Sequence, residues 1–189
     1  MKIIGGRFKG RKLKTPANDA VRPTLAKIRE AFFDIIGQYI QGSCFLDLYA
    51  GTGAIGIEAL SRGAGMVYFV ESSRDASTLL LKNLALIKDN LLDNNLYRVI
   101  RMDVNRAIEK IKEANARVDI AYIDPPYENT EAYEDILPLL VESRIMNTMF
   151  IVGVEHDRSM KDVMGKIVSG FHFKTYGYGD TCLTVVRRN

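Results

Sequence analysis

This sequence offers little material for disulfides, metal centres or membrane spans. Its two cysteines, Cys44 and Cys182, lie far apart and form no CxxC pair, so we expect buried free thiols. The two histidines, His156 and His172, show no ligand spacing with each other or with the cysteines, and we expect no metal site. No apolar run reaches the roughly 18 residues needed to span a bilayer. The start is basic and lacks the apolar core of a signal peptide, so we expect a cytoplasmic protein.

The length and composition are those of one globular domain. The 189 residues are 47% hydrophobic and 26% charged, which is enough apolar material for a sizeable core. The pattern changes near residue 42, the only candidate boundary. We expect residues 1–42 to be a basic extension and residues 43–189 to be the main domain.

The net charge of +3 conceals an uneven distribution. Residues 1–30 carry nine basic and two acidic residues, a net charge of +7, whereas the remainder carries −4. A basic arm on a mildly acidic body is typical of contact with a polyanion, although a solvated, charge-rich terminus is the simpler alternative. Interleaved glycines and apolar residues favour a short folded hairpin over residues 1–14. The candidate contacts are Arg7, Lys9, Arg11, Lys12, Lys14 and Arg29.

From residue 43 onward, strand and helix patterns alternate, which predicts a mostly parallel α/β sheet with helices on both faces. Two strands joined by a short glycine turn at the end predict an antiparallel pair. Upstream, Thr24 is a candidate cap for a helix. The predicted strands are 44–49, 66–70, 97–102, 118–123, 149–154, 168–176 and 182–186, and the predicted helices are 54–62, 74–88, 104–113, 131–144 (bent or split near Pro138) and 160–166.

A glycine-rich turn follows the first of these strands. Gly51, Gly53 and Gly56 match GxGxxG, and Glu71 closes the next strand 20 residues after Gly51. Glycines allow the backbone to approach a ligand closely, and a helix N-terminus offers free N–H groups. The acid can accept hydrogen bonds from ribose hydroxyls. These features predict an adenosine-type cofactor without choosing between a nicotinamide dinucleotide and S-adenosylmethionine; a purely structural turn is the alternative.

Two acids refine that choice. Asp47, four residues before Gly51, suits the methionyl ammonium of S-adenosylmethionine and would repel a pyrophosphate. Asp103 can accept a hydrogen bond from adenine, cap the helix that follows, or do both. The predicted cofactor contacts are Asp47, Ala50, Gly51, Thr52, Gly53, Glu71, Ser72, Asp103 and Val104.

The run Asp124-Pro125-Pro126-Tyr127 follows the fourth strand and should face the same crevice. The Asp124 carboxylate and the Pro125 carbonyl can accept both hydrogens of an exocyclic amine and direct its lone pair at a methyl donor. The two prolines stiffen the chain that carries these acceptors, and Tyr127 can stack on the base. A tight turn with an Asp cap is the alternative. We predict that all four residues are catalytic.

These residues resemble amino-methyltransferases with a (D/N)PP(Y/F) motif. Further segments are similar to the RsmD family: residues 3–13, Arg22-Pro23-Thr24, residues 29–33 and Tyr178-Gly179-Asp180-Thr181. The resemblance covers nearly the whole chain. It implies a Rossmann-like class I fold with seven strands, S-adenosylmethionine as cofactor, and methylation of guanine N2 in 16S ribosomal RNA. It also implies that Arg22 and Thr24 lie near the cofactor or target base.

The leading hypothesis is therefore an rRNA guanine-N2 methyltransferase, a monomer acting on small-subunit rRNA or an assembling 30S particle. The alternatives are a DNA adenine-N6 methyltransferase, a nicotinamide oxidoreductase, and a non-catalytic RNA-binding assembly factor. The absence of a separate target-recognition domain counts against DNA, Asp47 counts against a dinucleotide, and intact Asp124 and Tyr127 count against a non-catalytic role.

Overall fold

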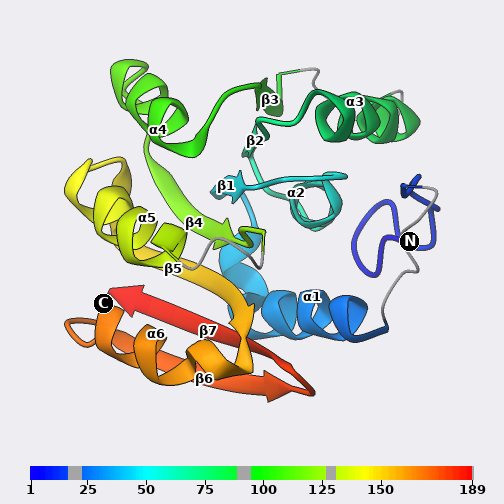
Figure 1. The fold of residues 1–189 in the computed structure, drawn as a ribbon. Helices are drawn as coiled ribbons and strands as arrows, with labels where there is room; N and C mark the ends of the chain where they lie inside the picture. Colours follow the sequence, from blue (N-terminus) through cyan, green and yellow to red (C-terminus); the bar gives the residue numbers. More distant parts are fainter. Residues whose placement is uncertain (17–22, 89–94, 127–130, 189) are drawn as a thin grey trace.

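One seven-stranded sheet organises the chain (Figure 1). The computed structural model describes residues 1–16, 23–88, 95–126 and 131–188. The strands are β1 Cys44–Leu48, β2 Met66–Val70, β3 Tyr97–Ile100, β4 Val118–Ile123, β5 Met146–Asp157, β6 His172–Tyr178 and β7 Thr181–Arg188. The helices are α1 Pro23–Ile36, α2 Ala54–Ser61, α3 Arg74–Lys88, α4 Val104–Glu113, α5 Glu131–Glu142 and α6 Lys161–Ile167, with 3₁₀ turns η1 Gly37–Ile40 and η2 Arg158–Met160.

The strand order is β3-β2-β1-β4-β5-β7-β6. Strands β1 to β5 pair in parallel, whereas β7 runs antiparallel to both β5 and β6. This confirms the predicted mostly parallel sheet with an antiparallel last strand. The order reverses between β1 and β4, and ligands of such sheets bind beyond the strand carboxyl ends at that point.

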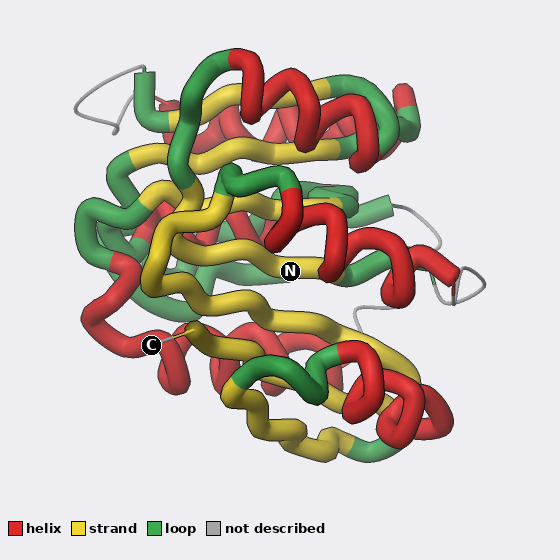
Figure 2. The backbone as a smooth tube through the Cα atoms, turned by 90° about the vertical axis from the view of Figure 1, so that its left-hand side faces the viewer, coloured by secondary structure: helices red, strands yellow, loops and turns green. Residues whose placement is uncertain are grey.

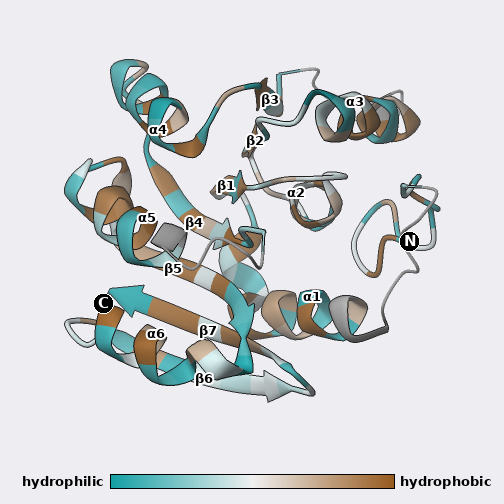
Figure 3. Cartoon of the chain, viewed as in Figure 1, coloured by the Kyte–Doolittle hydropathy of each residue, from teal (hydrophilic) through white to brown (hydrophobic). Residues whose placement is uncertain are grey.

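Helices cover both faces of the sheet (Figures 1 and 2). The apolar sides of α1, α2 and α3 form one core cluster with the sheet, and those of α4, α5 and α6 form the other. Central strands such as β4 and β7 are largely brown in the hydropathy view, because they are buried on both faces (Figure 3).

Several predicted boundaries shift. Strand β5 begins at Met146, not residue 149, because its first residue already pairs with Val118, and it continues to Asp157 alongside β7. Strand β6 begins at His172, since Val168 still bonds back to α6. Pro138 lies inside one continuous helix α5, so of the predicted bend or split the split is wrong. Helix α1 starts at Pro23, which places Thr24 inside the first turn and not at the cap.

The N-terminal segment folds back as a hairpin-like loop and not as two strands. Its one bridge joins Lys2 to Lys12. Gly6 has a φ of +72°, and a Cβ there would collide with the Ser61 carbonyl, so the loop lies directly on α2. Ile3, Phe8 and Leu13 are buried in the same core cluster as α1 to α3.

Candidate active site

The glycine loop links β1 to α2 in a left-handed conformation. Tyr49 and Gly51 have φ of 63° and 53°, and Gly51 N–H donates to Glu71 Oε2 at 2.8 Å. Gly53 has a φ of 80°, and a side chain there would collide with Leu80 of α3. The loop is thus held against α3, and three of its N–H groups bond within the protein: Ala50 to the Val70 carbonyl, Gly51 to Glu71 and Gly53 to the Ala50 carbonyl.

Asp47 lies beneath this loop. It is 2% exposed, and its Oδ2 accepts from the Gly56 N–H of α2 at 2.8 Å. Burial raises the pKa of Asp47 to about 7, with a smaller contribution from the charge of Glu71. The carboxylate therefore anchors the first turn of α2 beneath the loop. Its contact with a methionyl ammonium stays a prediction.

Glu71 directly follows β2, as predicted, whereas Asp103 lies three residues beyond β3, which ends at Ile100 and not at residue 102 as predicted. Glu71 holds the loop through Gly51 and accepts from the Ser73 N–H through Oε1 at 2.7 Å, so each oxygen retains one lone pair for a ribose hydroxyl. Asp103 accepts from the Arg106 N–H at 3.0 Å, which confirms the helix-cap alternative. Ser72 is exposed and Val104 is buried at the same edge.

The Asp-Pro-Pro run lies beside the glycine loop. Leu48 pairs with Ile123, so the residues that follow them, Tyr49 and Asp124, leave neighbouring strands together. Asp124 is half-buried, Pro125 buried and Pro126 exposed. Burial raises the pKa of Asp124 well above its usual range, and the charges of Glu155 and Asp47 add to this. Tyr127 lies outside the described residues, as does Arg22.

Sequence reasoning missed one carboxyl group of this edge, Glu155 of β5. It is 4% exposed, and its Oε2 accepts from the Tyr122 hydroxyl at 2.7 Å. Burial raises the pKa of Glu155, whereas the Tyr122 hydrogen bond lowers it. The available signal was an acid directly after an apolar strand run, the same pattern that marked Glu71 and Asp124.

The basic arm is fastened to α2 through Glu58. This fully buried carboxylate accepts from the Ile4 and Gly5 N–H groups at 2.8 and 2.6 Å, and pairs with Arg62 Nε at 2.9 Å and Arg29 Nε at 3.9 Å. Asn83 of α3 ties Lys14 to the glycine loop, because its Nδ2 donates to the carbonyls of both Lys14 and Thr52.

The predicted polyanion contacts divide into two groups. Arg7, Lys9, Lys12 and Lys14 are exposed. Arg29 is 4% exposed and donates to the Lys2 carbonyl at 2.7 Å, so its predicted RNA contact is wrong: the guanidinium fixes the arm from inside. Arg11 is half-buried, donates to the Leu86 carbonyl and lies over the Phe8 ring.

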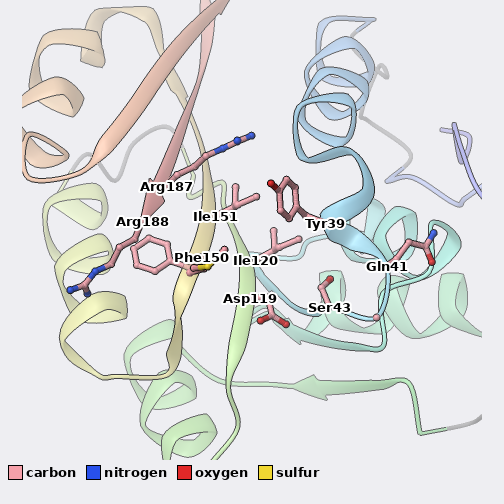
Figure 4. Close-up of a pocket in the computed structure, with 11 residues that line it drawn as sticks. Tyr39, Gln41, Ser43, Asp119, Ile120, Phe150, Ile151, Arg187 and Arg188 are labelled. Carbon is pink, nitrogen blue, oxygen red and sulfur yellow. The ribbon is translucent and has the colours of Figure 1, made fainter.

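A pocket of about 370 Å³ lies elsewhere, at the opposite edge of the sheet (Figure 4). Tyr39, Asp119, Phe150 and Arg187 are among the residues that line it, and they come from η1, the start of β4, β5 and the end of β7. None of the predicted site residues lines it. Because cofactor sites of such sheets lie at the strand carboxyl ends, we assign the chemistry to the other edge.

The part of the chain that the structure describes contains neither a membrane-spanning helix nor a metal-binding cluster. No helix there is long and apolar enough to cross a bilayer. No group of three or more His, Cys, Asp or Glu residues there is arranged to hold a metal ion.

The strand order, the glycine loop and the acids at the carboxyl edge define a Rossmann-like α/β protein of the class I methyltransferase architecture. A family model described as "Conserved hypothetical protein 95" matches residues 1–187. The chain belongs to this family, the RsmD family.

Named relatives cover most of the chain. "Putative rRNA methyltransferase YlbH" of Bacillus subtilis (strain 168) is 35% identical over 182 residues, which is 94% of each protein. "Ribosomal RNA small subunit methyltransferase D" of Escherichia coli (strain K12) is 32% identical, covering 83% of this chain and 75% of that protein. The solved structure "Putative methyltransferase yhhF from Escherichia coli" is similar with a TM-score of 0.82 at 25% identity, covering 100% of this chain and 98% of that one.

Proposed function

We propose that this protein transfers a methyl group from S-adenosylmethionine to the N2 amine of a guanine in 16S rRNA, as naked small-subunit rRNA or within an assembling 30S particle. The observation that carries the proposal is the β1–β4 pairing, which brings the glycine loop and Asp124 side by side at the switch point. The names of the relatives favour an rRNA substrate. The guanine N2 target is supported by the sequence resemblance. We expect a cytoplasmic monomer.

The site fits S-adenosylmethionine by the chemistry of its groups. A Cβ on Gly51 would come no closer than 3.9 Å to any neighbour, so space is open beside its backbone. Glu71 would accept the ribose hydroxyls, and Asp47 would supply negative charge near the methionyl ammonium. When bound, the cofactor supplies an electrophilic methyl group on a positive sulfonium. A solved structure described as "SMU.776, a putative methyltransferase complexed with SAH" shares the fold over 88% of this chain and 50% of that one, with a TM-score of 0.70 at 17% identity.

Asp124 and Pro125 would orient the amine. The guanine N2 lone pair is delocalised into the ring, so the nitrogen is a weak nucleophile until its hydrogens are held. The Asp124 carboxylate and Pro125 carbonyl accept those hydrogens and direct the lone pair at the methyl carbon. As N2 gains the methyl group it loses one proton, which Asp124 would receive. Tyr127 is expected to stack on the base.

The exposed residues Arg7, Lys9, Lys12 and Lys14 are proposed as phosphate contacts. They project from a loop that Glu58 anchors and Asn83 connects to the cofactor loop. RNA held by this arm would lie on the α2–α3 side of the active site.

The test is methyl transfer from labelled S-adenosylmethionine to rRNA and small-subunit particles from a strain lacking the protein. Asp124→Ala is the test variant, and Asp135→Ala, an exposed acid on α5, is the matched control. We expect label on a guanine N2 with wild type and control, and none with Asp124→Ala. Label on DNA adenine would instead support the adenine-N6 alternative. Bound cofactor with no transfer to any substrate would support an assembly factor.

A further inference from the structure

Glu155 and Asp124 face each other across neighbouring strands. Ile123 of β4 pairs with Val154 of β5, so Asp124 leaves β4 level with Glu155. The Glu155 side chain lies on the same face as Tyr122, whose hydroxyl donates to Oε2. The half-buried Asp124 carboxyl and the buried Glu155 carboxyl thus lie at one corner next to the glycine loop.

The second carboxyl oxygen of Glu155, Oε1, lacks a hydrogen bond among the described residues. Oε1 is buried and has no hydrogen-bond partner in the described part of the chain. An unsatisfied buried oxygen of this kind costs about 1–3 kcal/mol, and more when it is charged. The cost is avoided if Oε1 carries a proton and donates it to a neighbouring acceptor. Asp124, one residue beyond the Ile123–Val154 pair, is the acceptor that the strand register brings alongside, and two adjacent carboxyls cannot both ionise readily.

We propose that Glu155 is a positioning residue of the methyl-transfer site, which holds a proton shared with Asp124 so that Asp124 is the ionised partner when the substrate amine binds. The inference rests on the proposed function. In this arrangement the Tyr122 hydroxyl donates to Glu155 Oε2, and protonated Glu155 Oε1 donates to the Asp124 carboxylate. Asp124 keeps a lone pair to accept from the amine N–H. The N2–CH₃ bond forms as the S–CH₃ bond breaks, the N–H electron pair stays on N2, and the proton passes to Asp124.

The surrounding charges are consistent with one retained proton. Burial raises the pKa of both carboxyls, the charges of Glu155 and Asp47 raise the pKa of Asp124 further, and the Tyr122 hydrogen bond lowers the pKa of Glu155. In the free protein these effects favour the proton on Asp124; the N–H groups of the substrate amine, which donate to Asp124, favour its ionised form and shift the proton to Glu155. Tyr122 is fully buried, and its own pKa is raised well above 10. Burial lowers the pKa of Arg29, the charges of Glu58 and Tyr122 raise it, and the guanidinium is paired with Glu58.

Two further polar side chains near Glu155, those of Tyr133 and His156, have hydrogen-bond partners other than its carboxyl group. The Tyr133 hydroxyl donates to the main-chain carbonyl of Glu155. The ring of His156 lies within hydrogen-bonding distance of the Asp157 carbonyl and Thr184 Oγ1.

The experiment compares Glu155→Gln, Glu155→Leu and the exposed α5 control Glu134→Gln. An amide at position 155 can accept from Tyr122 and donate to Asp124, yet it cannot lose a proton. We expect Glu155→Gln to keep most of the kcat and to lack the alkaline decline that wild type shows as the shared proton leaves. Glu155→Leu should lose about 10²-fold in kcat, because Asp124 is no longer held. An inactive Glu155→Gln, or an unchanged alkaline limb, would overturn the proposal.

A second measurement needs no methylation. Infrared titration of the cofactor-free protein should show a carboxylic-acid C=O band that persists to high pH. In Glu155→Gln and Asp124→Asn its midpoint should move to lower pH, while Glu134→Gln should match wild type. A band unchanged in both variants would refute a shared proton even if methyl transfer is found. A band that shifts in a protein transferring no methyl to rRNA would instead refute the proposed function alone.

Discussion

The buried ion pair beneath the basic arm allows a stability prediction with a defined size. Replacing Glu58 by Gln keeps one acceptor for the Ile4 or Gly5 N–H but removes the counter-charge of Arg29. Breaking a buried pair by removing one partner typically costs 3–5 kcal/mol, because the other charge is left buried. We expect about 3 kcal/mol, the lower end, since the amide still accepts a hydrogen bond and Arg62 is partly solvated.

Urea unfolding followed by circular dichroism measures this loss as a lower midpoint with an unchanged m-value. For a chain of this length, about 3 kcal/mol corresponds to a fall in Tm of roughly 6–12 °C. The matched control is Glu109→Gln, which breaks a surface pair with Lys112 whose side chains are 54% and 53% exposed. Such exposed pairs contribute about 0–1 kcal/mol, so the control should stay near wild type.

A second substitution tests the cause of the loss. Adding Arg29→Met to Glu58→Gln removes the stranded cation and should restore part of the stability, although the bond from Arg29 to the Lys2 carbonyl is also lost. If Glu58→Gln unfolds within about 1 kcal/mol of wild type, or if the double variant is as unstable as the sum of the singles, the buried-charge reasoning fails.

Two further predictions concern ligands. Because the pKa of Asp47 is about 7 in the free protein, the affinity for cationic S-adenosylmethionine should fall as pH drops through 7, since protonation removes the charge that favours the ligand. Titration calorimetry should find this dependence lost in Asp47→Asn; the same dependence in that variant would assign it to another group. In filter binding to small-subunit rRNA, Lys9→Gln and Lys12→Gln together should reduce the slope of log affinity against log salt by roughly 1–2, at about 0.7–0.9 per phosphate contact. Lys161→Gln, an exposed lysine on α6, should leave the slope unchanged, and equal slopes in all variants would remove the arm from the RNA interface.

Strong local patterns were enough to predict most of the sheet. Strand β4 and helix α3 match their predicted bounds, because alternation of apolar runs with glycine and proline is a local property. The length of β5 was not predictable, since Met146 and Asp157 join the strand only through pairing with β4 and β7. The continuity of α5 through Pro138 also depends on context, because α5 packs along its length against the sheet.

The functional site, too, could be predicted from the sequence only in part. Residue type and position at a strand end indicated Asp47, Glu71 and Asp124. Burial is invisible in the sequence, and it decides what each charge can do. Arg29 looked like part of a basic arm, yet its helix turns it toward Glu58 and away from solvent. Glu155 directly follows the predicted strand 149–154, as Glu71 and Asp124 follow theirs, but no motif or spacing around it singled it out, and the structure places it inside the longer β5.

The acids at the carboxyl edge of the sheet fall into two kinds, and the difference explains their roles. Asp47, Glu71 and Asp103 each accept main-chain N–H groups, from Gly56, from Gly51 and Ser73, and from Arg106. Those donors tie Asp47 and Glu71 to the glycine loop and Asp103 to the start of α4, and they favour the charged form, although burial outweighs the Gly56 hydrogen bond and raises the pKa of Asp47 to about 7. Asp124 and Glu155 have no main-chain donor among the described residues; only the Tyr122 hydroxyl reaches the pair. A carboxyl pair without such donors keeps a proton until a ligand supplies hydrogen-bond donors, and an exocyclic amine supplies two. The corner that is costly to ionise in the free protein is therefore the one best prepared to hold the amine.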